Sequence, residues 1–318
     1  MSIDLVDTNA ADINNAIVQA RRRAGSPAMG MVLSLVVDAD ESTHYDAVRA
    51  AADAAHEHPS RILGVIRRPG RGAPRLDAEI RVAGEAGPGE VLLLRLHGKL
   101  ASHAESVVLP LLLPDAPVVA WWPGDAPEVP CDEPIGQLAS RRITDAAASG
   151  RPLAALGKRA AGYNPGDTDL SWTRLTPWRT LLAAALDEPY DHISGGTVEG
   201  ERSSPSAELL AVWLEHRLGV DVTRKSSKGP GLTAVRLDTK TGEIALTRPD
   251  GRLATLSRPG QPDRPVALQR RSTAELIAEE LRHLDPDDVY QKTIKQVGAK
   301  PPPKAEPKGP TGAARKSA

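Results

Sequence analysis

The first half of the sequence alternates apolar runs of strand length with segments of helical period. Continuous apolar runs predict buried strands, whereas the strictly alternating run at 75–84 predicts a strand nearer the edge of a sheet. The predicted strands are 30–40, 60–68, 75–84, 90–98 and 116–122, and the predicted helices are 8–23, 41–58 and 100–113. This order predicts a mixed, mostly wound α/β sheet with helices on both faces.

The middle of the chain reads as a helical connector. Residues 133–147 predict a short helix followed by one short edge strand. Residues 151–188 then predict a helix, a Gly/Pro/Asp loop and a second helix.

The second half predicts a smaller α+β unit that begins near residue 189. Ser204, Pro205 and Gly219 are the cap, first-turn and stop residues of a helix. Short strand candidates separated by turn signals predict a meander over 220–225, 231–239, 243–249 and 252–260, and a further strand covers 264–270. Ser272 and Glu275 form a capping box, and we expect the helices after it to cover this sheet.

The fold class is therefore mixed α/β and α+β. The predicted divisions are an N-terminal α/β domain at 1–150, a helical connector at 151–188, a C-terminal α+β domain at 189–297 and a tail at 298–318. The tail is rich in Pro, Gly, Ala and Lys and has almost no apolar residues, so we expect it to be disordered.

Charge and composition narrow the classes of partner. The 318 residues carry 40 basic and 41 acidic side chains, which predicts neither a nucleic-acid partner nor a membrane surface. The chain starts without an apolar signal core and has no bilayer-length apolar run, so we expect a cytoplasmic protein. Cys131 is the only cysteine, which excludes an internal disulfide.

Motifs for catalysis, cofactors and metals are missing from the sequence. The turn after the first long strand has no glycine and instead carries Asp38, Asp40 and Glu41, whose charges oppose a pyrophosphate and suit a helix N-terminus. The Walker A pattern and the glycine-flanked serine elbow are absent too. His56 and His58 are too close together to ligate zinc from one helix face. We therefore predict no catalytic residue, no cofactor site and no metal site.

Tryptophan is the feature that favours a protein partner. The chain has five tryptophans and no phenylalanine. Trp and Arg are enriched at interface hot spots, so we predict partner contacts in two segments that we expect to be exposed loops. The predicted partner-binding residues are Trp121, Trp122, Asp169, Trp172, Arg174, Trp178 and Arg179. Because neighbours on a strand point to opposite faces, only one of Trp121 and Trp122 can face a given core. The alternative for these tryptophans is ordinary core packing.

Several long segments resemble the glucose-6-phosphate dehydrogenase assembly protein, the OpcA family. The most specific are Trp-Trp-Pro-Gly at 121–124 and Asp-Thr-Asp-Leu-Ser-Trp-Thr-Arg at 167–174. The resemblance also includes 141–147, 204–220, 229–237 and 258–290, in the same order along the chain.

The resemblance implies a non-catalytic partner of glucose-6-phosphate dehydrogenase that promotes the active oligomer of this NADP-dependent enzyme of the oxidative pentose phosphate pathway. It supplies no catalytic residues; the assignment of partner contacts to the tryptophan segments comes from the composition of interfaces alone. The competing hypothesis is a metabolite sensor or enzyme that holds a sugar phosphate or nucleotide, with Arg141, Arg142 or Arg174 as anion contacts. Arginine pairs of this kind are, however, more typical of solvated faces.

Overall fold

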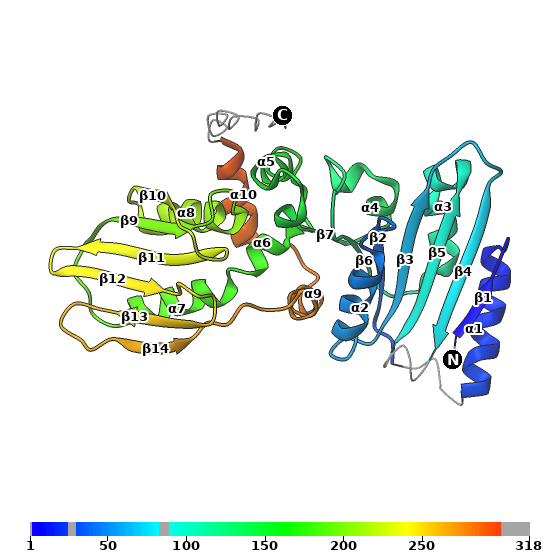
Figure 1. Ribbon diagram of the computed structural model, residues 1–318, viewed down its shortest axis with the longest axis horizontal. Helices are drawn as coiled ribbons and strands as arrows, with labels where there is room; N and C mark the ends of the chain where they lie inside the picture. Colours follow the sequence, from blue (N-terminus) through cyan, green and yellow to red (C-terminus); the bar gives the residue numbers. More distant parts are fainter. Residues whose placement is uncertain (1, 25–29, 83–88, 300–318) are drawn as a thin grey trace, which may run out of the picture.

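The computed structural model describes residues 2–24, 30–82 and 89–299, which form two β-sheets side by side along the long axis (Figure 1). The larger sheet has the strand order β1-β4-β5-β3-β2-β6-β7-β8. From β5 to β8 in this order all neighbours are parallel, whereas β4 is antiparallel to both β5 and β1. Its strands are β1 (Ser2–Leu5), β2 (Leu33–Ala39), β3 (Ser60–Arg68), β4 (Arg75–Val82), β5 (Glu90–His97), β6 (Val118–Trp122), β7 (Arg141–Thr144) and β8 (Asp167–Asp169). The predicted mixed α/β fold is confirmed.

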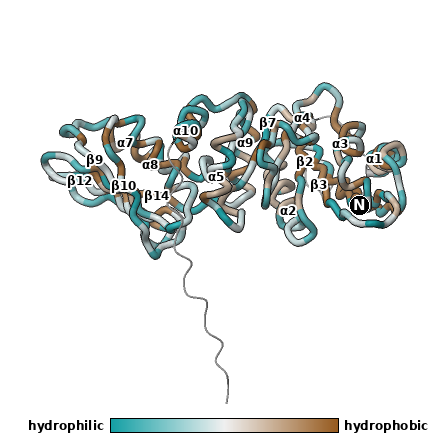
Figure 2. The backbone as a smooth tube through the Cα atoms, turned by 90° about the horizontal axis from the view of Figure 1, so that it is seen from above, coloured by the Kyte–Doolittle hydropathy of each residue, from teal (hydrophilic) through white to brown (hydrophobic). Residues whose placement is uncertain are grey.

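Helices cover both faces of this sheet, as the continuous apolar strands require. Apolar residues of α1 (Ala10–Ala24), α3 (Ala104–Val108) and α4 (Pro134–Leu138) form one core with one face of the sheet. Residues of α2 (His44–Ala54) and α9 (Thr273–Arg282) form a second core with the other face. Figure 2 shows the hydrophobic strands β2 and β3 between α2 on one side and α3 and α4 on the other. The short 3-10 turns are η1 (Gly98–Ser102), η2 (Leu109–Leu111), η3 (Pro130–Asp132) and η4 (Ala146–Ala148).

The edge of the sheet differs from the prediction. The strand after α4, expected at an edge, is β7, and it pairs with β6 on one side and with β8 on the other. We predicted a loop where β8 lies, because its three residues, Asp-Thr-Asp, show no apolar pattern. All three residues are buried. The edge strand is therefore stabilised by polar side chains, which bond Arg142 and Thr144 of the neighbouring strand β7.

The connector forms helices on either side of β8, as predicted. They are α5 (Pro152–Ala161), the single turn α6 (Leu170–Thr173) and α7 (Thr176–Asp187). Pro152 and Pro177 stand in the first turns of α5 and α7, where a missing amide proton is tolerated. Leu156, Trp178 and Leu182 of these helices pack into the core of the second unit.

The second sheet has the order β10-β9-β11-β12-β13-β14. Its strands are β9 (Ile193–Gly200), β10 (Val222–Ser226), β11 (Leu232–Thr239), β12 (Gly242–Thr247), β13 (Leu253–Ser257) and β14 (Arg264–Ala267). Helix α8 (Pro205–Leu218) joins the parallel strands β9 and β10. The hydroxyl of Ser204 accepts from the amide of Ala207, and Gly219 ends the helix at φ 68°, so both predicted signals are confirmed.

The meander prediction is correct for β11 to β14 and wrong for the first strand candidate. Residues 220–225 become β10, which pairs in parallel with β9 instead of joining the antiparallel run. Strand β9 itself was not predicted, because Gly195 and Gly196 interrupt any apolar alternation.

Only one of the last two helices, α10, joins the core of the second unit, where we expected both. Helix α9 begins with the expected capping box of Ser272 and Glu275, but it packs against α2 of the first unit and not on the second sheet. Helix α10 (Asp288–Ala299) packs against both α5 and α8. The reason is the apolar face of α9: Leu276, Ile277 and Leu281 complete the core around α2. The end of the chain therefore joins the two units.

The predicted disordered tail lies, from residue 300 onward, outside the described residues. In the part of the chain that is described, every helix is too short or too polar to cross a bilayer.

Candidate functional site

Open α/β sheets usually bind ligands at the carboxyl ends of their parallel strands. In this chain the carboxyl ends of β2, β3 and β6 carry a network of the protein's own charges. The guanidinium of Arg67 bonds the Asp38 carboxylate at 2.8 Å and the Glu133 carboxylate at 2.7 Å. The indole N–H of Trp122 donates to the same Asp38 carboxylate at 3.3 Å. Burial opposes the charge of Arg67, but its hydrogen bonds to the two carboxylates raise its pKa overall.

Carboxylates of the protein bond backbone amides at the start of α4 and in the turn before α2. Glu133 accepts from the amides of Ile135 and Gly136 at the start of α4, at 2.7 and 3.1 Å. Asp40 accepts from the amides of Ser42 and Thr43 just before α2, both at 2.9 Å. These are the donors that bind phosphate in dinucleotide sites. The acidic residues of this turn therefore have partners within the protein: Asp40 bonds the turn amides, Asp38 pairs with Arg67 and Glu41 pairs with Arg68.

The Trp121-Trp122 pair lies in the core. Their exposed fractions are 1% and 2%, so the expectation that these indoles stand exposed in a loop is wrong. The physical reason is that β6 is an interior strand with helices on both of its faces. The two side chains do point to opposite faces, as predicted: Trp121 joins the core with α2, and Trp122 joins the core with α3 and α4.

Trp172 and Trp178 are also buried, each with an exposed fraction of 2%, so the expectation of exposure is wrong here too. The Trp172 N–H donates to the Asp287 carboxylate at 2.8 Å, and the guanidinium of Arg179 stacks 3.8 Å from its ring centroid. The guanidinium of Arg248 lies 5.0 Å from the ring centroid of Trp178. Trp172 therefore supports the partly exposed Arg179, whereas Trp178 packs beside the buried Arg248.

Asp145, Asp169 and Arg174 fix the turn between β7 and η4 against α6. Arg174 forms a bidentate pair with Asp145 at 2.8 and 2.6 Å. Asp169 is fully buried and accepts from the Thr144 hydroxyl and from the amides of Ala146 and Ser171, at 2.7 to 2.9 Å. Burial, and then the negative charge of Asp145, raise the pKa of Asp169. Asp145 was not among the predicted site residues, although it directly follows a strand.

The three arginines of the competing hypothesis are all held in internal contacts. Arg141 pairs with Glu280 of α9 and donates to the carbonyl of Asp285. Arg142 pairs with Asp167 and donates to the carbonyl of Ala139. With Arg174 held by Asp145, none of these three arginines offers a free guanidinium to an anion in this arrangement.

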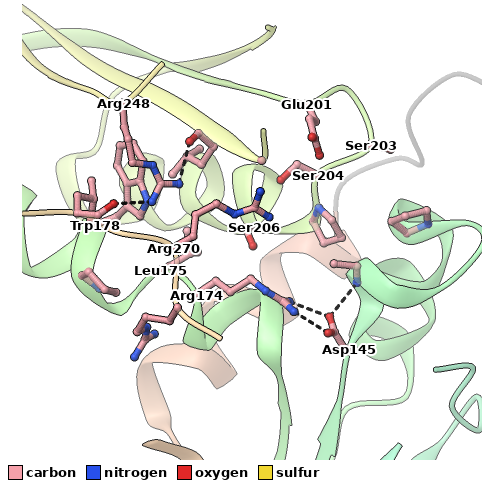
Figure 3. A pocket seen from close by; sticks show the side chains of 18 of the residues that line it. Asp145, Arg174, Leu175, Trp178, Glu201, Ser203, Ser204, Ser206, Arg248 and Arg270 are labelled. Atoms are coloured by element: carbon pink, nitrogen blue, oxygen red, sulfur yellow. Dashed lines mark hydrogen bonds and ion pairs between the residues drawn. The ribbon is translucent and has the colours of Figure 1, made fainter. Parts of the chain in front are cut away.

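A polar pocket of about 350 Å³ opens beside this junction (Figure 3). It lies between η4, the turn from α6 to α7, the start of α8, the end of β12 and the segment before α9. The arginines that line it are Arg174, Arg248, Arg270 and Arg271, and the lining carboxylates are Asp145 and Glu201. Arg270 and Arg271 were not among the predicted site residues. The signal that could have found them is a pair of adjacent basic residues directly before the helix cap at Ser272.

Among the described residues, no group of three or more His, Cys, Asp or Glu side chains is arranged to hold a metal ion.

Comparison with known proteins gives two family matches. Residues 51–161 match the family described as the glucose-6-phosphate dehydrogenase subunit N-terminal domain, and residues 165–294 match the corresponding C-terminal domain. No curated protein sequence matches the chain.

Solved structures share only a weak likeness with the chain. A 3-ketoreductase from Actinomadura kijaniata has 11% identity and a TM-score of 0.49 over 84% of this chain and 95% of its own. An oxidoreductase from Sinorhizobium meliloti has 10% identity and a TM-score of 0.47, over 84% and 96%. A biliverdin reductase from Synechocystis sp. PCC 6803 has 9% identity and a TM-score of 0.44, over 83% and 96%. These values are too low to assign a function.

Proposed function

Because the chain belongs to the OpcA family of glucose-6-phosphate dehydrogenase assembly proteins, we propose that it binds this dehydrogenase and raises the population of its active oligomer without catalysing a reaction. The observation that supports this choice of partner is the pair of family matches at 51–161 and 165–294.

The charge network at the carboxyl ends of β2, β3 and β6 supports a non-catalytic role. A dinucleotide at this place would need phosphate-binding amides and room for its pyrophosphate. Glu133 already bonds amides at the start of α4, Asp40 bonds amides in the turn before α2, and Arg67 pairs with both Asp38 and Glu133. A bound pyrophosphate would have to displace three carboxylates, a large penalty for charges that are already paired.

Activation follows from linkage. A partner that binds the active oligomer better than the inactive or dissociated form shifts the equilibrium by the ratio of the two affinities. A tenfold rise in the active population needs only about 1.4 kcal/mol of differential binding. One or two well-placed interface residues supply that much.

The junction around α6 and α7 is the surface that we propose for the dehydrogenase. Arg174 and Arg179 are partly exposed there, and they are the predicted residues that can reach a partner directly. In this conformation the four tryptophans and Asp169 are buried and cannot meet a partner directly. Trp172 supports Arg179 and Asp169 holds the turn after β7, whereas Trp121 and Trp122 pack in the cores of the larger sheet. That all seven residues belong to the partner-binding region stays a prediction.

Direct binding tests this proposal. We expect the protein to retain purified glucose-6-phosphate dehydrogenase of the same organism in a co-purification assay. Arg179→Glu should raise the Kd by about tenfold or more, because it reverses a charge at the proposed contact. Arg264→Glu is the matched control, because it reverses the charge of an arginine that is exposed in β14, away from the junction.

The melting temperature of each variant is measured alongside the Kd. Failure of the unmodified protein to retain the dehydrogenase contradicts the proposed function. A folded Arg179→Glu variant with an unchanged Kd contradicts the proposed surface.

A further inference from the structure

The pocket at the start of α8 carries an excess of positive charge, because four arginines line it against two carboxylates, Asp145 and Glu201. Arg174 and Arg271 have carboxylate partners, Asp145 and Glu279. Within the described residues, neither Arg248 nor Arg270 forms an ion pair, although both line the same pocket. Burial, together with the nearby charge of Arg270, lowers the pKa of Arg248 to about 10.

Arg248 is the most unusual of these side chains. It is only 5% exposed, and its guanidinium donates to the carbonyls of Leu268 and Leu232 at 2.8 and 3.1 Å. Its Nε atom is buried and has no hydrogen-bond partner. A buried guanidinium without a carboxylate is rare in proteins, because desolvation of the charge needs compensation. This arrangement points to an anion that completes the site.

The helix start adds a second source of positive potential. Helix α8 has 14 residues, and its first turn, with Ser204, Pro205 and Ser206, lines the pocket. Figure 3 shows Arg270 reaching into the pocket toward Ser206. The partial positive charge of a helix N-terminus therefore lies on the same side as two unpaired guanidinium groups.

The volume of the pocket and the residues that line it limit the class of anion that can bind. A volume of about 350 Å³ lies at the small end of the range for small-molecule sites and exceeds that of a simple ion. Leu175, Pro177 and Leu268 supply apolar wall, and Glu201 supplies a carboxylate. A carboxylate accepts hydrogen bonds from hydroxyl groups and repels a second anionic group.

We propose that this pocket binds a small phosphate monoester of a polyhydroxylated compound, with the phosphate at Arg248 and Arg270 and the hydroxyl groups toward Glu201. Arginine forks suit phosphate oxygens, and the single lining carboxylate left outside the Arg174 pair disfavours ligands that are anionic at both ends. This site goes beyond the proposed function, because a ligand can bind here without the dehydrogenase.

Calorimetry and thermal shift of the isolated full chain test the site. Glucose 6-phosphate is the probe, glucose is the uncharged control and inorganic phosphate is the arm without hydroxyl groups, all at constant ionic strength. We expect glucose 6-phosphate to bind and, at one hundred times its Kd, to raise the Tm by roughly 5 °C. Inorganic phosphate should bind more weakly, and glucose should not bind.

Two variants locate the site. Arg270→Gln should weaken glucose 6-phosphate binding by about tenfold or more and leave the Tm of the free protein unchanged, because Arg270 is exposed. Arg264→Gln, an exposed arginine outside the pocket, should bind like the unmodified protein.

The assignment is overturned if glucose 6-phosphate does not bind at millimolar concentration, if glucose or inorganic phosphate binds as tightly as glucose 6-phosphate, or if Arg270→Gln does not change the Kd. Retention of the dehydrogenase by the same preparations distinguishes failure of this site from failure of the proposed function.

Discussion

At the scale of single residues, the tryptophans show that the direction of a side chain on a strand can be predicted from the sequence, whereas its burial cannot. The sequence places Trp121 and Trp122 on one strand, and their opposite directions follow from strand geometry alone. Their burial depends on helices that arrive from distant parts of the chain: α9, for example, begins 151 residues after Trp122. No local pattern reports such a contact, so a residue type enriched at interfaces was read as exposed.

Trp121→Ala tests this burial. The side chain is 1% exposed and packs with α2 and α9, so its loss should lower the free energy of unfolding by about 3–5 kcal/mol through lost burial and a cavity. Tyr45→Ala is the control, because Tyr45 is 61% exposed and should change stability by about 0.5 kcal/mol or less. Urea unfolding measures both. Similar stabilities for the two variants would mean that Trp121 is not a core residue.

At the scale of elements, the sequence predicts best where local signals are strong. Helix α8 was predicted with both of its ends, because Ser204 and Gly219 cap the helix through contacts within one turn of the chain. Strands β8 and β9 were missed, since one is a polar triplet and the other contains Gly195, Gly196 and Gly200. Their pairing is decided by neighbouring strands and by close packing, neither of which leaves a periodic pattern in the sequence.

The glycines of β9 supply a matched test of that close packing. A Cβ at Gly200 would lie 2.8 Å from the carbonyl oxygen of Gly231, whereas a Cβ at Gly195 would meet its nearest atoms at 3.5 and 3.6 Å. Gly200→Ala should therefore destabilise the protein by about 1–3 kcal/mol, and Gly195→Ala should be tolerated. Thermal unfolding compares the two. An equal loss of stability in both variants would indicate a general intolerance of side chains in β9 and contradict the steric explanation.

At the scale of the whole molecule, the two units are tied together by the end of the chain. Helix α9 packs on α2, α10 packs on α5 and α8, and Arg141 of the first unit pairs with Glu280 of α9. The junction that carries Asp145, Arg174 and the pocket therefore lies within one continuous network. A surface built in this way is pre-ordered before it meets a partner, which lowers the entropy lost on binding.

The central claim is that this protein raises the active population of glucose-6-phosphate dehydrogenase by differential binding, and it is tested most directly by titration. The oligomer distribution is measured by light scattering, and turnover is measured in the same samples as the protein is added. We predict that the active oligomer and the turnover increase together and saturate at the same concentration. If the protein is added to saturation and neither the oligomer distribution nor the kinetic parameters change, the claim is contradicted.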